Sequence, residues 1–277
     1  MILRRRWLLG AVVLCLAPGA RSDSTAVPGA RSVFLEDLTW TELRDAVRSG
    51  RTLALIPIGG TEQSGPAIAL GKHNTRARYL AGRIARELGN AIVAPVVAYV
   101  PEGQVDPATS HMRFPGTLTI PDDAFEKTIE FAARSLRAHG FRDIVLLADH
   151  GGYRQDLDHV AQHLNREWSN TGVRVHFLHE YYEAASEGYA RILRERGYRD
   201  DEIGTHAALA DTSLMLAIDP SEVRTDVLTS GAPLGSAQGI YGGDPRRASA
   251  DLGRAGVDHI VDRSVAAIRL HVSRTAH

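Results

Sequence analysis

The chain has 277 residues, of which 44% are hydrophobic, and its formal net charge is −1. That length and composition suffice for one large α/β domain with a substantial buried core. No basic stretch with interleaved aromatic residues occurs, which argues against nucleic acid as a partner. Cys15 is the only cysteine, so the sequence excludes a fold held by intramolecular disulfides.

The first 20 residues have the pattern of a secretory signal peptide. A basic Arg4-Arg5-Arg6 run precedes an apolar stretch too short for a membrane anchor, and a small-residue cleavage site ends at Ala20. Residues 21–32 are small and polar, which predicts a flexible leader. We therefore expect a periplasmic or secreted protein, exported by the general or the twin-arginine route, with no membrane attachment after cleavage. A single catalytic domain is expected over residues 33–277.

Helical and strand patterns alternate along that domain. The expected helices cover residues 39–50, 75–88, 121–138, 155–168, 182–196, 205–218 and 248–271. The expected strands cover residues 52–58, 91–97, 143–148 and 173–178. Strands that alternate with helices in this way predict a mostly parallel sheet covered by helices on both faces.

Two glycine-rich segments that follow predicted strands carry groups suited to metal binding. Glu62 lies in the first segment, with His73 further along, and His150 directly follows the strand at residues 143–148. In α/β proteins the loops at the carboxyl ends of strands are where ligands bind. Two histidines and a glutamate brought together there would form a divalent metal site with room for a water, as in a hydrolase.

Five motifs, in order along the chain, resemble those of the creatininase family of metal-dependent hydrolases. They are Gly60-Thr61-Glu62-Gln63 with Gly65-Pro66, Phe114-Pro115-Gly116-Thr117, His150-Gly151-Gly152, His206-Ala207 followed by Asp211-Thr212-Ser213, and Gly242-Gly243-Asp244-Pro245. The resemblance implies a three-layer α/β/α sandwich. It also implies hydrolysis of a C–N bond in a cyclic or formyl amide, two divalent metals, and a homo-oligomer, commonly a hexamer.

The resemblance implies that Glu62 and His150 are metal ligands, but the chain departs from the family at the second metal. His73 stands where the family has a bridging aspartate, Ser64 where it has a histidine, and Gly152 where creatininase has a glutamate. An imidazole offers one lone pair and cannot bridge two cations as a carboxylate can. We therefore expect one divalent ion per subunit, held by Glu62, His73 and His150. Zinc is favoured, with manganese or iron as alternatives.

Two further positions are implied by the resemblance. His206 matches a proposed proton donor, and Asp211, which replaces a glutamate, is expected either to bind the metal or to act on the water as a base. Both fall in the helix expected at residues 205–218. One alternative concerns the first motif: if its loop held one extra residue, Asn74 and not His73 would be the ligand.

The long segment at residues 99–117 is expected to be a functional loop, in which His111 could face the pocket. Tyr153 is expected in the pocket wall. The chain is thus predicted to be a secreted metal-dependent amidohydrolase that cleaves a small amide with a metal-activated water. The alternatives are a lactone or other ring-opening hydrolase on the same fold, or a degenerate, non-catalytic protein that binds a small molecule.

Overall fold

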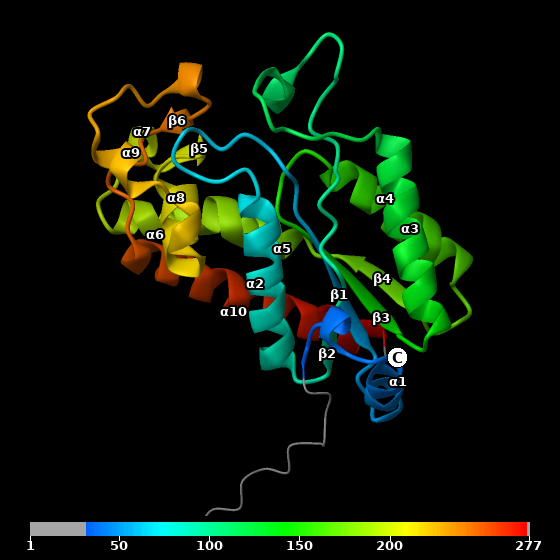
Figure 1. The fold of residues 1–277 in the computed structure, drawn as a ribbon. Coiled ribbons are helices and arrows are strands. Elements are labelled where there is room, and N and C mark those ends of the chain that lie inside the picture. The colour runs from blue at the N-terminus through cyan, green and yellow to red at the C-terminus, as the bar shows by residue number, and fades with distance from the viewer. Residues whose placement is uncertain (1–31, 276–277) are drawn as a thin grey trace, which may run out of the picture.

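The computed structural model describes residues 32–275. The predicted signal peptide and all but the last residue of the predicted leader lie outside this range. Figure 1 shows a central sheet with helices on both faces, and a group of short elements gathered on one side of it. Within residues 32–275, no helix has both the length and the apolar character needed to cross a membrane.

The helices and strands alternate along most of the chain. The helices are α1 (Trp40–Arg48), α2 (Lys72–Leu88), α3 (Asp122–Ala138), α4 (Arg154–Glu167), α5 (His179–Glu183), α6 (Tyr189–Glu195), α7 (Asp200–Ile203), α8 (Leu209–Ile218), α9 (Thr225–Thr229) and α10 (Ala250–Thr275). The strands are β1 (Leu53–Ile58), β2 (Ala91–Val93), β3 (Asp143–Ala148), β4 (Arg174–Phe177), β5 (Gly204–His206) and β6 (Tyr241–Gly243).

Four strands form a parallel sheet in the order β2-β1-β3-β4. In its centre, Leu53 of β1 pairs with Asp143 of β3, and the register continues to Ile58 opposite Ala148. Because the two strands are adjacent and parallel, the segments that follow Ile58 and Ala148 leave the same edge of the sheet side by side. This edge carries the candidate site.

The two faces of the sheet bury alternate residues of the same strands. Leu55 and Val145 pack in a cluster with buried residues of α2 and α10, whereas Ile56 and Leu146 pack with residues of α3 and α4. Since helices cover both faces, β1 is apolar and buried along its whole length. The predicted three-layer α/β/α sandwich with a parallel central sheet is confirmed (Figure 1).

Two element boundaries differ from the prediction near the sheet. Helix α2 begins at Lys72, three residues before the expected start, so His73 lies in its first turn instead of in the preceding loop. Strand β2 ends at Val93. It is shorter than expected because the regular ladder with β1 is interrupted: Ala94 N–H donates to the Leu55 carbonyl, and the next bond to β1 comes only from Val97 N–H.

The expected helix at residues 205–218 is wrong at its start. Residues Gly204–His206 form β5, which pairs antiparallel with β6, and α8 begins only at Leu209. Ala207 between them has a positive φ of 53°, which no helical turn allows. His206 and Asp211 therefore belong to different elements and do not follow helical spacing.

Candidate metal centre

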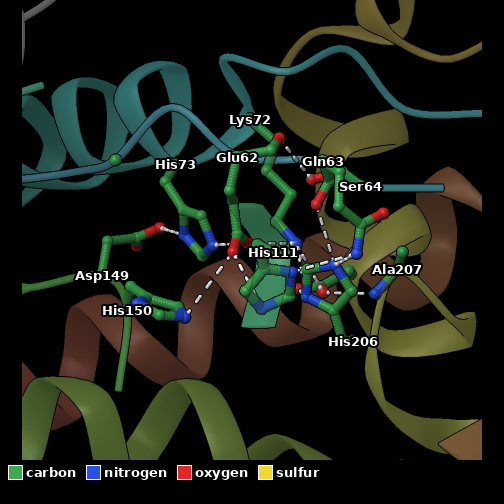
Figure 2. A network of polar contacts seen from close by, with 12 residues as sticks. Glu62, Gln63, Ser64, Lys72, His73, His111, Asp149, His150, His206 and Ala207 are labelled. Atoms are coloured by element: carbon green, nitrogen blue, oxygen red, sulfur yellow. Dashed lines mark hydrogen bonds and ion pairs between the residues drawn. The ribbon is translucent and has the colours of Figure 1, made fainter. Parts of the chain in front are cut away.

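The site lies where three segments meet beyond the carboxyl ends of the strands. Glu62 comes from the loop after β1 and His150 from the turn after β3, while Glu102 and His111 come from the long segment between β2 and α3. In Figure 2, the Glu62 carboxylate lies at the centre, with imidazole rings and a lysine ammonium around it. The adjacency of β1 and β3 explains why residues almost ninety positions apart along the chain meet here.

Tyr153 ties the two strand ends together. Its hydroxyl oxygen lies 2.8 and 2.7 Å from the carbonyl oxygens of Ile58 and Gly59, which share its one hydrogen, and it accepts the His150 backbone N–H at 3.1 Å. The side chain is fully buried beneath the loops and does not line the cavity described below. The pocket-wall role expected for Tyr153 is therefore wrong, since the residue supports the site from within the core.

Asn74 fixes the shape of the first loop. Its Oδ1 accepts the Gly60 N–H at 3.0 Å, and its Nδ2 donates to Thr61 Oγ1 at 3.2 Å. Both amide atoms are thus engaged by the turn, which favours His73 over Asn74 as the residue offered to a ligand. Gly60 also allows a close approach, because a Cβ at this position would lie 2.7 Å from Glu102 Oε1.

The two carboxylate oxygens of Glu62 face different neighbours. Oε1 lies 2.8 Å from His73 Nε2 and 3.4 Å from Lys72 Nζ. Oε2 lies 3.2 Å from His111 Nε2 and 3.7 Å from His150 Nε2, yet no described residue hydrogen-bonds to it. Burial raises the pKa of Glu62, but Lys72 and His73 outweigh burial and hold the pKa far below its ordinary value. The carboxylate is therefore ionised.

On the Oε2 side of Glu62, a second buried carboxylate lies without donors. No described residue hydrogen-bonds to either side-chain oxygen of Glu102, and His150 Nδ1 is 3.5 Å from its Oε1. Burial and the negative charge of Glu62 raise the pKa of Glu102 to about 9. Two neighbouring buried carboxylates are costly when both are ionised, and either a proton on Glu102 or a bound cation removes that cost. Sequence reasoning did not identify Glu102; its position in the long loop expected to be functional was the available signal.

His150 is suited to bind that cation. Burial lowers its pKa to about 4, so the ring is neutral at neutral pH and keeps one nitrogen lone pair for a metal. Glu62, Glu102, His111 and His150 each offer one ligand atom, and these atoms lie within 4.8 Å of one another. Ligands at about 2.0–2.2 Å from a metal lie at most about 4.4 Å apart, so little contraction is needed. The residues on the Oε2 side fit a divalent metal.

His111 is the fourth residue of this group, and its contacts show which ring nitrogen carries the hydrogen. The Gln63 side-chain oxygen accepts the Gly65 N–H at 2.9 Å, so the Gln63 nitrogen must be the atom 3.0 Å from His111 Nδ1. Because Gln63 donates to Nδ1, the ring hydrogen of His111 is on Nε2, which lies 3.2 Å from Glu62 Oε2 but outside hydrogen-bond geometry. The Gly152 N–H donates to His150 Nδ1 at 3.3 Å in the same way, so the hydrogen position does not separate the two rings. Only His150 of the two borders the cavity described below, and we therefore take Glu62, Glu102 and His150 as the ligand set, with His111 beside it.

The Oε1 side of Glu62 contains a protein cation. Lys72 is fully buried, and its Nζ lies 3.4 Å from Glu62 Oε1, 3.0 Å from Asp211 Oδ2 and 3.4 Å from His206 Nδ1. Sequence reasoning overlooked this residue, although a lysine in the first turn of a helix opposes the helix dipole and so suggests another role.

Asp211 is engaged by three donors. Its carboxylate accepts from Lys72, from Arg76 Nη1 at 2.7 Å and from the Ala207 N–H at 2.8 Å. Burial raises the pKa of Asp211, but Lys72 and Arg76 outweigh burial and hold the pKa well below its ordinary value. An anion held in this way is a weak base. The ligand or base role expected for Asp211 stays a prediction. Its contacts favour a role in holding the Lys72 ammonium and the Arg76 guanidinium in place.

His206 lies between Gln63 and Lys72. Its Nε2 is 2.9 Å from the Gln63 carbonyl oxygen, which can only accept, so Nε2 carries the ring hydrogen and Nδ1 faces Lys72. Burial and the charge of Lys72 lower the pKa of His206 to about 3, which makes the ring neutral at neutral pH. To act as the expected proton donor, His206 must first take up a proton during the reaction.

His73 is held between two carboxylates. Its Nδ1 lies 2.7 Å from Asp149 Oδ2, and Asp149 also accepts from Arg76 Nε and the Tyr181 hydroxyl, both at 2.8 Å. Nδ1 donates to Asp149, and Nε2, 2.8 Å from Glu62 Oε1, donates to that carboxylate. A carboxylate behind Nδ1 is also common among metal-binding histidines. The ligand role of His73 stays a prediction, and Asp149 is the residue that orients it.

A cavity of about 320 Å³ opens beside these groups. His73, His150, His206 and Asp211 are all among the residues that line it. Such a volume suits a small molecule. The cavity therefore brings a bound molecule next to the predicted site residues.

Fold and site together define a class: a parallel α/β protein with a buried carboxylate and imidazole cluster at its strand ends, as in metal-dependent hydrolases. The family model described as "Creatininase: Creatinine amidohydrolase" matches residues 36–268. The chain belongs to the creatininase family and is a creatininase-family hydrolase.

Curated relatives and solved structures agree with this membership. The chain is 26% identical over 209 residues to the creatinine amidohydrolase of Pseudomonas putida, covering 73% of this chain and 78% of the relative. It is 30% identical over 189 residues to a mycofactocin precursor peptide peptidase of Mycolicibacterium smegmatis, covering 66% of this chain and 65% of the relative. A mutant creatininase described as Zn-Zn type superposes with a TM-score of 0.70 at 25% identity, covering 87% of this chain and 99% of that one.

Proposed function

We propose that this protein is a metal-dependent amidohydrolase that cleaves a C–N bond in a small amide, using one divalent ion held by Glu62, Glu102 and His150. The observation that carries the proposal is the pair of buried carboxylates on the Oε2 side, whose facing oxygens accept no hydrogen bond from the described residues, although His111 Nε2 lies 3.2 Å from Glu62 Oε2. Two carboxylates and one imidazole suit zinc, the favoured metal, and also manganese.

A divalent ion bound there supplies Lewis acidity and lowers the pKa of water. The protein's own groups do the rest. Lys72 and His73 keep Glu62 ionised, and Asp149 orients His73. His206 borders the cavity as a neutral ring and can take up a proton and return it to a leaving nitrogen, in accord with its expected role.

Family membership supports the choice of bond. One matched relative is named a creatinine amidohydrolase and another a precursor peptide peptidase, and both names denote cleavage of C–N bonds. The cavity of about 320 Å³ accommodates a small cyclic amide or the end of a peptide. The substrate class we propose is therefore a small amide.

Metal analysis and a substrate panel test this proposal. Protein purified without chelator should contain close to one ion per subunit, and Glu102→Gln, which keeps the shape but removes the charge, should lose most of it. Creatinine, a short peptide amide and a lactone should then be compared as substrates. Absence of metal from the wild-type protein would sink the proposal, and hydrolysis of the lactone alone would favour the ring-opening alternative.

We also propose that the protein is exported to the periplasm or secreted, and that it assembles as a homo-oligomer, with the hexamer expected from the family resemblance. Export is supported by the signal-peptide pattern of residues 1–20. Sequencing the N-terminus of protein from the native host tests export, and an intact Met1 in cytosolic material would contradict it. Light scattering of the purified protein tests the oligomer.

A further inference from the structure

Glu62 borders two cation positions, one at each oxygen. We propose that the Lys72 ammonium permanently occupies one of them, so that this centre binds one metal where a relative described as Zn-Zn type holds two. Lys72 is then a built-in replacement for a second metal ion. This inference rests on the proposed function, because it assumes a metal on the Oε2 side.

The two positions have matching surroundings. Each is bordered by one oxygen of Glu62, by a second carboxylate and by an imidazole. On the Oε2 side these are Glu102 and His150. On the Oε1 side they are Asp211 Oδ2 and His206 Nδ1, at 3.0 and 3.4 Å from the ammonium nitrogen. Carboxylates and imidazoles are typical metal ligands, and here three of their atoms surround an ammonium group instead.

Formal charge gives an independent argument for one metal. Four carboxylates meet in the centre, those of Glu62, Glu102, Asp149 and Asp211. The cations of the protein here are Lys72 and Arg76, and His73 adds a third when both its ring nitrogens donate, since its Nδ1 and Nε2 lie 2.7 and 2.8 Å from Asp149 and Glu62. With all four carboxylates ionised, one negative charge then remains. One divalent ion brings the net charge to +1, whereas a second would bring it to +3 in a buried site, which costs free energy.

The placement of Lys72 in the fold fits this role. It is fully buried, and it stands in the first turn of α2, where the helix dipole disfavours a positive charge. A buried ammonium is stable only with anionic partners, and Glu62 and Asp211 supply them. The ammonium does not line the cavity, so Lys72 acts by setting the charge of the centre and not by touching a substrate.

Removing the ammonium should convert the centre into a two-metal site. Lys72→Ala leaves Glu62 Oε1, Asp211 Oδ2 and His206 Nδ1 around the freed volume and removes one positive charge from the centre. We expect the metal content to rise from one to two ions per subunit, measured by mass spectrometry of the metal after dialysis in micromolar zinc. The double variant Lys72→Ala/Asp211→Asn lacks one of these ligands and should return to one ion.

The outcomes separate this inference from the proposed function. One ion in the wild type and one in a folded Lys72→Ala variant overturns the inference alone, whereas no ion in the wild type overturns the proposed function as well. If circular dichroism shows that Lys72→Ala does not fold, zinc titration of the wild type decides. Saturation at one ion supports the inference, and a second ion bound with micromolar affinity overturns it.

Discussion

The two sides of the Glu62 carboxylate have the same chemical make-up but differ in where their positive charge comes from. On the Oε1 side, Lys72 compensates Glu62 and Asp211 from within the chain. On the Oε2 side, the oxygens of Glu102 have no hydrogen-bond donor among the described residues. A carboxylate cluster whose charge is compensated by a side chain of the same protein is stable in the folded state without an added ion. A cluster that requires a bound ion makes the free energy of folding depend on the metal concentration.

Replacing one histidine on each side of Glu62 should give the largest difference between the two sides, with a loss of metal affinity in one variant and a loss of turnover in the other. His150→Ala removes a ligand. We expect metal affinity to fall about 1,000-fold, because each ligand contributes a part of the roughly 10–16 kcal/mol of binding free energy found for structural zinc sites. His206→Ala should keep the metal but lose about 100- to 10,000-fold in turnover, the usual contribution of a general acid or base. Metal titration and steady-state kinetics measure both. Metal loss in His206→Ala would remove the contrast.

The stability of the metal-free protein should distinguish the two sides next. Lys72→Met leaves Glu62 and Asp211 short of a buried cation, and breaking such a pair costs about 3–5 kcal/mol. Glu102→Gln should change the stability of the metal-free protein little, because Glu102 with a pKa of about 9 is already protonated at neutral pH. Urea unfolding after chelator treatment provides the comparison. Equal losses in both variants would show that the two sides do not differ in this way.

Asp149→Asn tests whether His73 also serves the metal. The change keeps the shape but weakens the contact that orients the His73 ring. If His73 is a ligand, metal affinity should fall about 10- to 100-fold, the usual effect of removing a carboxylate behind a metal-binding histidine. A control is Tyr181→Phe, which removes one hydrogen bond to Asp149 without changing its charge and should have a smaller effect. Unchanged affinity in Asp149→Asn would rule out a ligand role for His73.

The smallest expected effect is a dependence of metal binding on pH through Glu102. Its pKa of about 9 in the folded metal-free protein means that a proton must leave before the carboxylate binds a metal. Apparent affinity should therefore rise about tenfold per pH unit from pH 7 towards 9. For the same reason, the metal-free protein should lose stability as pH rises from the ordinary glutamate pKa towards 9, because the folded state binds the extra proton.

Glu102→Gln is the matched control for this dependence, since an amide has no proton to release. Calorimetry in buffers of different ionisation enthalpy counts the protons released on binding. His150 and His206 have lowered pKa values of about 4 and 3, so they affect stability only as pH falls below their ordinary value. They do not obscure the change above pH 7. A proton count near zero for the wild type would contradict the raised pKa of Glu102.

Much of the fold could be predicted because its signals are local. The apolar runs of β1 and β3 and the helical spacing of α3 and α4 are visible in the sequence, and parallel adjacent strands bring Glu62 and His150 together. Glu102 could not be identified, because an irregular loop has no periodicity to show which side chains point inward. The β5 segment was missed because nothing in the residue type of Ala207 indicates its positive φ.

The role of Lys72 could not be predicted for a different reason. A lysine is normally exposed, and only the three-dimensional arrangement shows that its ammonium lies among Glu62, Asp211 and His206. The departures at Ser64 and His73 led to the expectation of a single metal ion, but they carry no information about Lys72.

A metal on the Oε2 side would also anchor the long segment between β2 and α3. Bound to Glu62, Glu102 and His150, it would link three stretches of backbone that are far apart in the sequence and would hold that segment in place. Residues 32–275 contain no cysteine, so no disulfide within them can hold the segment in place. Stripping the metal should therefore expose the segment around residues 99–117 to proteases before the rest of the chain unfolds.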